Sequence, residues 1–516
     1  MSNHNQYISE SIVNLLATLG CKNACISPGA RNTPIIFALD KNQFINTYSI
    51  LDERTAGFFA LGIAKETREP VILNCTSGTA LANFLPAIIE ARMSQVPIIL
   101  LTADRPKKLI NRGENQTIFQ HNFYGKYVLS SVEVECIDNN IDSILKDINK
   151  AYNACLGITE KEALSEKGPI HINIHIEEPL VSQFTQFDKH DFKIAEVLID
   201  KKTSNHSNLK PDFEKPIIVC GQTDLRHNKD AIFKLSEQIN APILSDISSN
   251  IHSHDNVIQY YDHYIEYINP DLIFRFGKKP LSKRLNNLLE NLQDITYLIT
   301  QRNVFNDDVK HLISIDEVLN SVNKNKGSDK WLNLLKGYDD QIEENISSSI
   351  KDNEIHEYNF AFSIMDYIPN QSNIFIGNSL MIRAFDSHSK KFDKDILFLS
   401  NRGASGIDGN ISTALGISIA SPERSNFLII GDQAFMHDIG SLQLLKELES
   451  NLTIIIINNM GGAIFDYLNL SDSNTDAYEK FIRRSHTMNF KPIVHGYGLD
   501  YTQLNSLKDL SKISSR

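Results

Sequence analysis

Short hydrophobic runs recur along the chain, and most of them end in Gly, Asn, Asp or Ser before a helical pattern begins. These runs predict buried strands at 71–75, 97–102, 216–220, 272–276, 373–376, 396–399, 426–430 and 452–457. Buried strands that alternate with helices are typical of parallel α/β layers. The segment IHINIHI (170–176) alternates strictly between apolar and polar residues instead, which predicts a half-exposed or edge strand.

Two polar segments interrupt this pattern, KKTSNHSN (201–208) and SVNKNKGSDK (321–330), and both are predicted to be linkers. They divide the 516 residues into an N-terminal domain at 1–200, a central domain at 209–322 and a C-terminal domain at 350–516. We expect each domain to be α/β, with its own doubly wound, mostly parallel sheet. In such sheets ligands bind beyond the carboxyl ends of the strands, so candidate functional residues are sought there.

Composition excludes several classes of protein. The chain is 41% hydrophobic and 22% charged, as an ordinary globular protein is. The first residues carry no basic and apolar leader pattern, and no apolar run approaches the ~20 residues of a membrane helix. The net charge of −12 disfavours nucleic acid and anionic membranes as partners. The six cysteines form no CxxC pair, which predicts reduced, buried thiols in a cytoplasmic protein and no zinc site.

The clearest chemical signal lies in the C-terminal block. Gly431-Asp432 ends one predicted strand, and Asn459, with a glycine-rich turn that offers a nearby backbone carbonyl, follows the next. Carboxylate, amide and carbonyl oxygens suit Mg²⁺ when phosphate oxygens complete its shell. A glycine-rich turn and a helix N-terminus also offer N–H groups to a diphosphate. Either segment alone is better explained as a helix cap or a loop, but the pair at matched strand ends favours a metal–diphosphate site.

Acidic and basic residues elsewhere are less specific taken singly. Glu53 precedes a helix, where the helix dipole alone would favour an acid. Arg31, Arg105 and Arg402 each follow a predicted strand, and any one of them could be an ordinary surface charge. Their recurrence at strand ends in an acidic protein favours a site for carboxylates, which Arg binds bidentately.

Ten segments resemble, in order, the 2-succinyl-5-enolpyruvyl-6-hydroxy-3-cyclohexene-1-carboxylate synthase family of thiamine-diphosphate-dependent enzymes. They are ISPGARNTP (26–34), DERTAGFFALGIAK (52–65), TSGTALANFLPAIIEA (76–91), LTADRP (101–106), ENQTI (114–118), SKRL (282–285), GNSLMIR (377–383), NRGASGIDG (401–409), GDQAFMHD (431–438) and NNMGGAIF (458–465). Single segments are weak signals, whereas ten in order are highly specific.

The resemblance implies thiamine diphosphate and Mg²⁺, which Mn²⁺ can replace. It assigns the metal to Asp432, Asn459 and the Gly461 carbonyl, and activation of the cofactor to Glu53. It assigns cofactor contacts to Ser379, Ile407, Gly431, Asp432, Asn459 and Ile464. It assigns substrate binding to Arg31, Arg105, Asn115, Gln116, Lys283, Arg284, Arg383, Arg402, Phe465 and Leu468.

The resemblance also implies the reaction, in which 2-oxoglutarate is decarboxylated and the resulting acyl anion adds to isochorismate, an early step of menaquinone synthesis. Because the family's cofactor lies between subunits, a homodimer is the expected minimum and a homotetramer is compatible. Another thiamine-diphosphate decarboxylase or carboligase is the main alternative, disfavoured because a substrate such as pyruvate needs fewer cations than Lys283, Arg284 and Arg383 supply. A non-catalytic relative is disfavoured by intact Glu53 and Asp432.

Two departures from the family pattern stand out. Gln433 replaces the last glycine of the usual GDG motif. The chain also ends at Arg516, earlier than the family pattern. We expect a last amphipathic helix with Leu504, Leu507 and Leu510 on one face, no closing strand, and a less stable C-terminal domain.

Overall fold

The computed structural model describes residues 4–136, 141–158, 166–181, 212–300, 309–322, 325–351, 355–468 and 475–513. The chain separates into two compact units. The first contains Met1–Lys201, Asn401–Glu423 and Ala434–Leu452, and the second contains Lys202–Ser400, Arg424–Gln433 and Thr453–Arg516.

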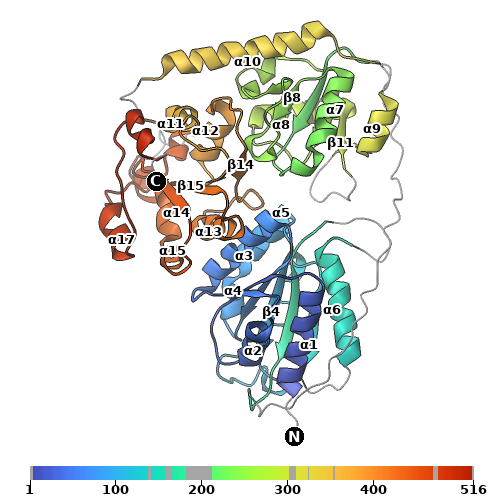
Figure 1. Cartoon of the computed structure of the whole chain (residues 1–516), viewed down its shortest axis with the longest axis vertical. Coiled ribbons are helices and arrows are strands. Elements are labelled where there is room, and N and C mark those ends of the chain that lie inside the picture. Colours follow the sequence, from blue (N-terminus) through green and yellow to red (C-terminus); the bar gives the residue numbers. More distant parts are fainter. Residues whose placement is uncertain are drawn as a thin grey trace. The chain divides into compact units, whose positions relative to one another are not determined.

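The first sheet lies in the first unit and contains β4, which is labelled in Figure 1. Its strands are parallel, in the order β2-β1-β3-β4-β6-β5. Its strands are β1 (Asn23–Ile26), β2 (Asn46–Ser49), β3 (Val71–Cys75), β4 (Ile98–Asp104), β5 (Ser131–Glu135) and β6 (Ile170–His175). Its helices are α1 (His4–Thr18), α2 (Thr33–Lys41), α3 (Glu53–Thr67), α4 (Ala80–Asn83), α5 (Leu85–Ser94) and α6 (Ile141–Cys155).

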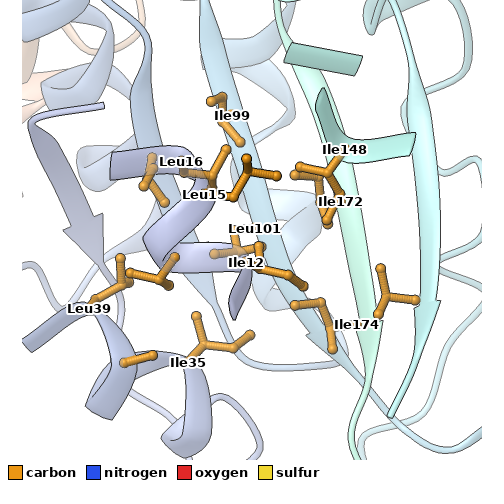
Figure 2. Close-up of a cluster of buried hydrophobic side chains, with 14 of the residues drawn as sticks. Ile12, Leu15, Leu16, Ile35, Leu39, Ile99, Leu101, Ile148, Ile172 and Ile174 are labelled. Carbon is orange, nitrogen blue, oxygen red and sulfur yellow. The ribbon is translucent and has the colours of Figure 1, made fainter. Parts of the chain in front are cut away.

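Alternate residues of the central strands face two separate cores. Ile99 and Leu101 of β4 pack with α1, α2 and α6, as Figure 2 shows, whereas Ile98 and Leu100 pack with α3, α4 and α5. Because both faces are covered, β4 begins with the continuous apolar run Ile98–Leu101, as the hydrophobic pattern predicted.

The prediction of an edge or half-exposed strand at 170–176 is wrong. β6 lies between β4 and β5, and every residue of it is buried. One face carries isoleucines that join the core of Figure 2. The other face carries His171, Asn173 and His175, which form hydrogen bonds with neighbouring side chains. A buried polar network therefore produced the same alternation that a solvated face would.

The second sheet is also parallel, in the order β12-β11-β10-β7-β8-β9. Its strands are β7 (Pro216–Cys220), β8 (Ile243–Ser245), β9 (Val257–Ile258), β10 (Leu272–Phe276), β11 (Thr296–Ile299) and β12 (His311–Ile313). Helices α7 (Lys229–Ile239) and α9 (Ile315–Ser321) cover one face, and α8 (Lys283–Asn291) and α10 (Asp329–Ser349) cover the other.

The third sheet has the order β14-β13-β15-β16. Its strands are β13 (Ser372–Ile376), β14 (Ile396–Leu399), β15 (Ser425–Gly431) and β16 (Leu452–Ile457), and α11 (Glu357–Ile364) and α12 (Leu380–His388) pack against them. Further along the chain are α13 (Asn410–Ala420), α14 (Asp432–His437), α15 (Leu442–Glu447), α16 (Thr475–Ala477) and α17 (Phe490–Gly496). The fold class predicted from the sequence, α/β with three doubly wound sheets, is confirmed.

Helix α13 groups with the first unit because it packs closely on α3. A Cβ atom at Gly62 would lie 2.1 Å from the carbonyl oxygen of Thr413, so the two helix backbones meet where neither has a side chain to separate them. This contact places the segment before α13, which contains Arg402 and Ile407, in the unit that also carries Glu53.

Other predicted features agree in part. All six cysteines are free and buried, as predicted. Leu507 and Leu510 are buried, but they lie on a 3₁₀ helix, Leu507–Lys512, rather than on a longer amphipathic α-helix. Asp329 and Lys330 begin α10 rather than ending a linker, and the 201–208 linker lies outside the described residues. Within the described ranges, no helix combines the length and apolar character that crossing a membrane requires.

Candidate active site

Asp432 stands at the carboxyl end of β15 as the first residue of α14, and it is buried. Its Oδ2 accepts a hydrogen bond from the Gly461 N–H at 3.0 Å. The Nε2 atom of His486 lies 3.2 Å from the same oxygen. The ends of β15 and β16 are therefore adjacent, as the strand–helix–strand spacing predicts, and Asp432 faces the glycine-rich turn.

Asn459 lies in that turn with its amide fixed at one end only. Its Nδ2 donates to Glu357 Oε1 at 2.7 Å, which orients the side chain. Its Oδ1 is buried and has no hydrogen-bond partner within the described part of the chain. A buried acceptor without a donor is costly unless another group satisfies it. An oriented amide oxygen in the turn that contacts the buried Asp432 carboxylate therefore fits a divalent cation.

Gln433, the departure from the GDG pattern, has a structural role. Its Nε2 donates to the carbonyl oxygens of Arg483 at 2.8 Å and Arg484 at 3.2 Å. The Arg483 carbonyl also accepts from the Gly462 N–H at 2.7 Å. The larger side chain thus ties the segment after 475 to the glycine-rich turn, which a third glycine could not do.

The apolar residues assigned to the same turn lie just beyond it. Ile464 and Phe465 are half-buried on a 3₁₀ helix, Ala463–Tyr467, and Leu468 is exposed. A Cβ atom at Gly462 would lie 2.9 Å from the Phe465 ring, so glycine lets that ring approach the turn. Gly431, in contrast, borders open space, because a Cβ atom there would meet nothing within 4 Å.

Ser379 and Arg383 lie together at the start of α12. Ser379 follows β13 with φ +74°, a backbone conformation that L-residues rarely adopt. The Arg383 guanidinium donates to the Ser379 carbonyl oxygen at 2.6 Å, and both residues are exposed. Strain at a strand end beside an exposed cation is typical of a ligand-binding position.

Lys283 and Arg284 are exposed in the first turn of α8, where the helix dipole disfavours cations. Ser282 caps this helix by accepting from the Leu285 N–H. Arg284 is 3.6 Å from Asp262 and 3.5 Å from Glu266, so neighbouring acids already neutralise it. Lys283 forms no ion pair with any described residue, which leaves it the freer of the two for an anionic ligand.

Glu53 begins α3 in the first unit. Asp52 caps the helix by accepting from the Thr55 N–H at 3.1 Å, so Glu53 is not needed as the cap. The Glu53 carboxylate is half-buried, and Asn83 donates to it at 3.4 Å. Its charge also contributes, after burial, to raising the pKa of the Cys75 thiol, which places Glu53 beside the buried end of β3.

Of the five predicted substrate residues in the first unit, four follow β1 and β4. Arg31 is buried, and it donates to the Ile176 carbonyl oxygen at 3.1 Å and to Glu178 at 2.8 Å. Ile176 donates its N–H to the Asp104 carbonyl, so Arg31 and Arg105 lie at the same edge of the sheet. Gln116 donates to the Ser77 carbonyl at 3.1 Å, after β3. Asn115, next to it in sequence, is exposed.

The loop 401–409 carries Arg402 and Ile407, which is 42% exposed although it is apolar. Glu90 of α5 holds this loop, accepting from the N–H groups of Gly403 at 2.8 Å and Ala404 at 2.7 Å. Lys65 lies 3.5 Å from Glu90 and donates to Asn401 at 2.7 Å. The backbone of the loop that carries Arg402 and Ile407 is therefore held in place by hydrogen bonds to Glu90.

The charges of this anchor are strongly perturbed by burial. Burial alone raises the pKa of Glu90, but Lys65, Ser94 and the two loop N–H groups together bring the pKa below its ordinary value. Burial lowers the pKa of Lys65, although Glu90 opposes the shift. The pair is thus charged only because each partner compensates the other.

Sequence reasoning missed Glu90, Glu357 and His486, each of which touches a predicted site segment. Glu90 lies inside one of the ten matching segments, where an acid among apolar residues of a helix could have drawn attention. Glu357 and His486 are distant in sequence from Asp432 and Asn459, and only the fold brings them close.

Comparisons with known proteins agree with this architecture. Residues 7–123 match the thiamine pyrophosphate enzyme N-terminal TPP binding domain, residues 190–376 the middle domain of thiamine pyrophosphate, and residues 380–516 the thiamine pyrophosphate enzyme C-terminal TPP binding domain. The chain is therefore a thiamine-diphosphate-dependent enzyme, a class that uses a divalent metal such as Mg²⁺ with its cofactor.

Named relatives specify the family further. The chain is 34% identical to a 2-succinyl-5-enolpyruvyl-6-hydroxy-3-cyclohexene-1-carboxylate synthase of Listeria welshimeri, over 99% of this chain and 93% of that protein. It is 31% identical to the Lysinibacillus sphaericus protein of the same name, with the same two shares, and 33% identical to that of Desulfitobacterium hafniense, over 95% and 91%. The chain belongs to this synthase family, and the predicted family, enzyme class, function and cofactor are confirmed.

Proposed function

We propose that Asp432, Asn459 and the carbonyl of Gly461 hold the divalent metal. The supporting observation is the buried Oδ1 of Asn459, which has no hydrogen-bond partner among the described residues and lies in the same turn as Gly461, whose N–H donates to Asp432. Removal of one anionic ligand would leave the diphosphate charge uncompensated. Gly431 and the N-terminus of α14 are the proposed diphosphate contacts, since open space borders Gly431.

Glu53 is the proposed acid–base residue. When bound, thiamine diphosphate supplies a thiazolium ring that acts as an electron sink for decarboxylation. Glu53 would hold a proton at its carboxyl oxygen for the aminopyrimidine ring, a role that its half-buried position supports. Ile407 is the proposed apolar support for the cofactor, with Ser379 and Ile464 as further contacts.

The proposed substrates are 2-oxoglutarate, which is decarboxylated, and isochorismate, to which the resulting acyl anion is added. Both are dicarboxylates, so the exposed and strand-end cations are their proposed partners. These residues are Arg31, Arg105, Asn115, Gln116, Lys283, Arg284, Arg383 and Arg402, with Phe465 and Leu468 as an apolar wall. Arg31 and Arg284 already pair with acids, so Arg105, Lys283 and Arg383 carry most of this proposal.

A homodimer is the proposed minimum active unit, located in the cytoplasm, with domains at 1–200, 209–322 and 350–516. In each unit, a large apolar side chain is exposed next to a proposed site residue. Leu51 is 70% exposed beside Glu53, and Met460 is 57% exposed beside Asn459. Such residues beside a polar site support coverage by a second subunit. A homotetramer remains compatible with this arrangement.

A complementation experiment tests these assignments together. Inactive Glu53→Gln and Asp432→Ala proteins are unfolded, mixed and refolded, or coexpressed with two tags. If each site combines Glu53 of one subunit with Asp432 of another, the mixed dimer regains one intact site. The mixture then reaches about a quarter of wild-type activity by random pairing. Absence of recovery, with mixed dimers demonstrated by the tags, would contradict the shared site.

A further inference from the structure

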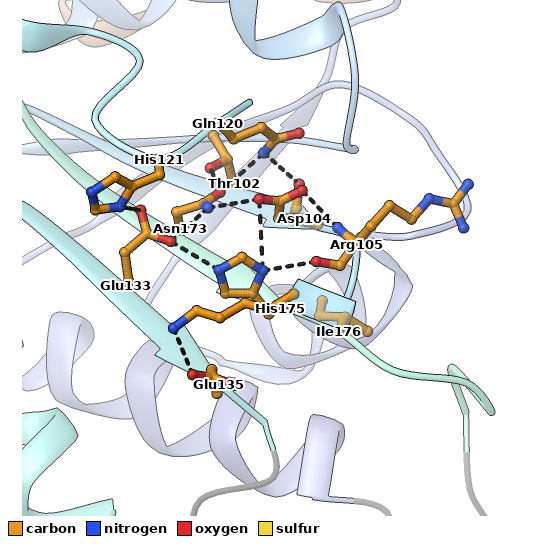
Figure 3. Close-up of polar contacts among 12 residues, drawn as sticks. Thr102, Asp104, Arg105, Gln120, His121, Glu133, Glu135, Asn173, His175 and Ile176 are labelled. Atoms are coloured by element: carbon orange, nitrogen blue, oxygen red, sulfur yellow. Dashed lines mark hydrogen bonds and ion pairs between the residues drawn. The ribbon is translucent and has the colours of Figure 1, made fainter. Parts of the chain in front are cut away.

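Arg105 is held by its backbone on both sides. Its N–H donates to Asp104 Oδ1 at 2.7 Å, and its carbonyl oxygen lies 2.7 Å from His175 Nδ1. Both partners are almost completely buried. Figure 3 shows the Arg105 guanidinium extending away from these contacts. Its Nε is buried and has no hydrogen-bond partner within the described residues, so the side chain is not fixed by the network itself.

The two backbone contacts belong to a continuous buried network (Figure 3). His175 Nε2 lies 2.9 Å from Glu133 Oε2, and Asn173 Nδ2 donates to both Asp104 and Glu133 at 2.9 Å. A carbonyl can only accept, so His175 Nδ1 is the donor to Arg105. His175 therefore links the Arg105 carbonyl to the Glu133 carboxylate, and its Nδ1 also lies 3.6 Å from Asp104 Oδ2.

The same network reaches the segment on which Gln116 rests. Gln120 donates to Asn173 Oδ1 at 3.0 Å and accepts from the Gly78 N–H at 2.9 Å. A Cβ atom at Gly78 would lie 2.8 Å from the Gln116 Cγ, so Gln116 packs directly on this segment. The network therefore connects the end of β4, which Arg105 follows, with the segment after β3, which Gln116 contacts.

A buried network of this kind costs free energy, because its charged groups lose their hydration. The opposite face of β6 is packed with isoleucines, and apolar residues of similar volume often stabilise a core as well as buried charges do, or better. Asp104 also bears a cost here, because burial raises its pKa to about 6 despite its hydrogen bond from Asn173. A polar cluster that includes the residue before Arg105 and holds the Arg105 backbone suggests a purpose other than stability.

We propose that His175 and Glu133 are positioning residues. They fix the backbone of Arg105 and so set the position from which its guanidinium binds a substrate carboxylate. This inference rests on the proposed role of Arg105 in substrate binding. Neither positioning residue needs to touch the substrate, since His175 acts through the Arg105 carbonyl and Glu133 acts through His175.

A double-mutant cycle in the holoenzyme tests the proposal. His175→Leu removes the donor to Arg105 at similar volume, and we expect the KM of one dicarboxylate substrate to rise about tenfold with kcat nearly unchanged. In an Arg105→Ala background the same change should leave KM unaffected, because the guanidinium that binds the carboxylate is already absent. His175→Asn keeps a donor near the Nδ1 position and should restore most of the lost affinity.

His171→Leu is the matched control. His171 lies on the same face of β6 and is equally buried, but it contacts Thr102 rather than Arg105. It should lower stability without changing KM. If His175→Leu does not fold, Glu133→Gln replaces it, with a smaller rise in KM and the same loss of effect in the Arg105→Ala background.

The outcomes separate the inference from the proposed function on which it rests. A rise in KM of equal size with and without Arg105 would show a merely structural role and overturn the inference. An unchanged KM for His175→Leu, when Arg105→Ala does raise KM, would overturn it as well. An Arg105→Ala enzyme with unchanged KM would instead overturn the substrate role of Arg105.

Discussion

Replacing Glu90 by Gln would remove the buried charge that fixes the 401–409 loop. The carboxylate accepts from the N–H groups of Gly403 and Ala404, from Ser94 and from Lys65. A glutamine offers only one acceptor oxygen, so its NH₂ group would face a donor. Lys65 would keep its bond to Asn401 but lose its buried counter-charge.

Removing one partner of a buried ion pair costs about 3–5 kcal/mol, and the remaining bond of Lys65 favours the lower end of that range. We therefore expect opening of the loop to become about 100-fold more favourable, which corresponds to roughly 3 kcal/mol. Hydrogen exchange followed by mass spectrometry would show this as lost protection in peptides covering 401–409. A Lys65→Met/Glu90→Gln protein should recover part of the loss, because no unpaired charge remains.

The stabilisation should also depend on pH. The pKa of Glu90 is lowered in the folded protein, so its contribution is present above the ordinary value of 4.5 and is lost as pH falls through the folded value. The wild type and the Glu90→Gln protein should therefore converge in stability in acid. Glu69→Gln, which breaks an exposed pair with Lys22, is the control and should change stability by less than ~1 kcal/mol. Unchanged protection of 401–409 in Glu90→Gln would refute the anchoring role.

Three further predictions concern Asp432, Glu53 and Arg383. Asp432→Ala should lose Mg²⁺-dependent binding of thiamine diphosphate in calorimetry, while Asn458→Ala, in the same turn, should retain it; binding by Asp432→Ala would exclude the metal assignment. Glu53→Gln should bind the cofactor but exchange its thiazolium proton far more slowly, and unchanged exchange would leave Glu53 as a helix-start residue. Arg383→Ala should raise the KM of a dicarboxylate by one to two powers of ten, about 1.5–3 kcal/mol, and a fall in cofactor affinity instead would reassign it.

Local pattern was sufficient to predict the strands on which the site is built. β3, β7, β10, β14 and β16 have the predicted bounds, because each is an apolar run bounded by polar or turn-forming residues. The motif positions followed from their places after those strands. Asp432 and the glycine-rich turn meet because consecutive parallel strands end at the same edge of a sheet.

Contacts between distant segments could not be predicted in this way. The polar alternation of β6 is identical in sequence whether it faces water or a hydrogen-bonded network, and only the position of β5 decides between them. The anchoring of the 401–409 loop by Glu90 joins residues more than 300 positions apart, and nothing local marks either end. The 3₁₀ helix at Leu507–Lys512 was misassigned because leucine spacing alone does not separate a 3₁₀ turn from a longer α-helix.

The central claim, that this chain joins 2-oxoglutarate to isochorismate, is tested most directly by product analysis. The protein is incubated with Mg²⁺, thiamine diphosphate and 2-oxoglutarate, with and without isochorismate, and the products are identified by mass. We predict release of carbon dioxide together with 2-succinyl-5-enolpyruvyl-6-hydroxy-3-cyclohexene-1-carboxylate only when both substrates are present, and no product from the Asp432→Ala protein. Turnover of pyruvate in place of 2-oxoglutarate, with no isochorismate-dependent product, would contradict the account.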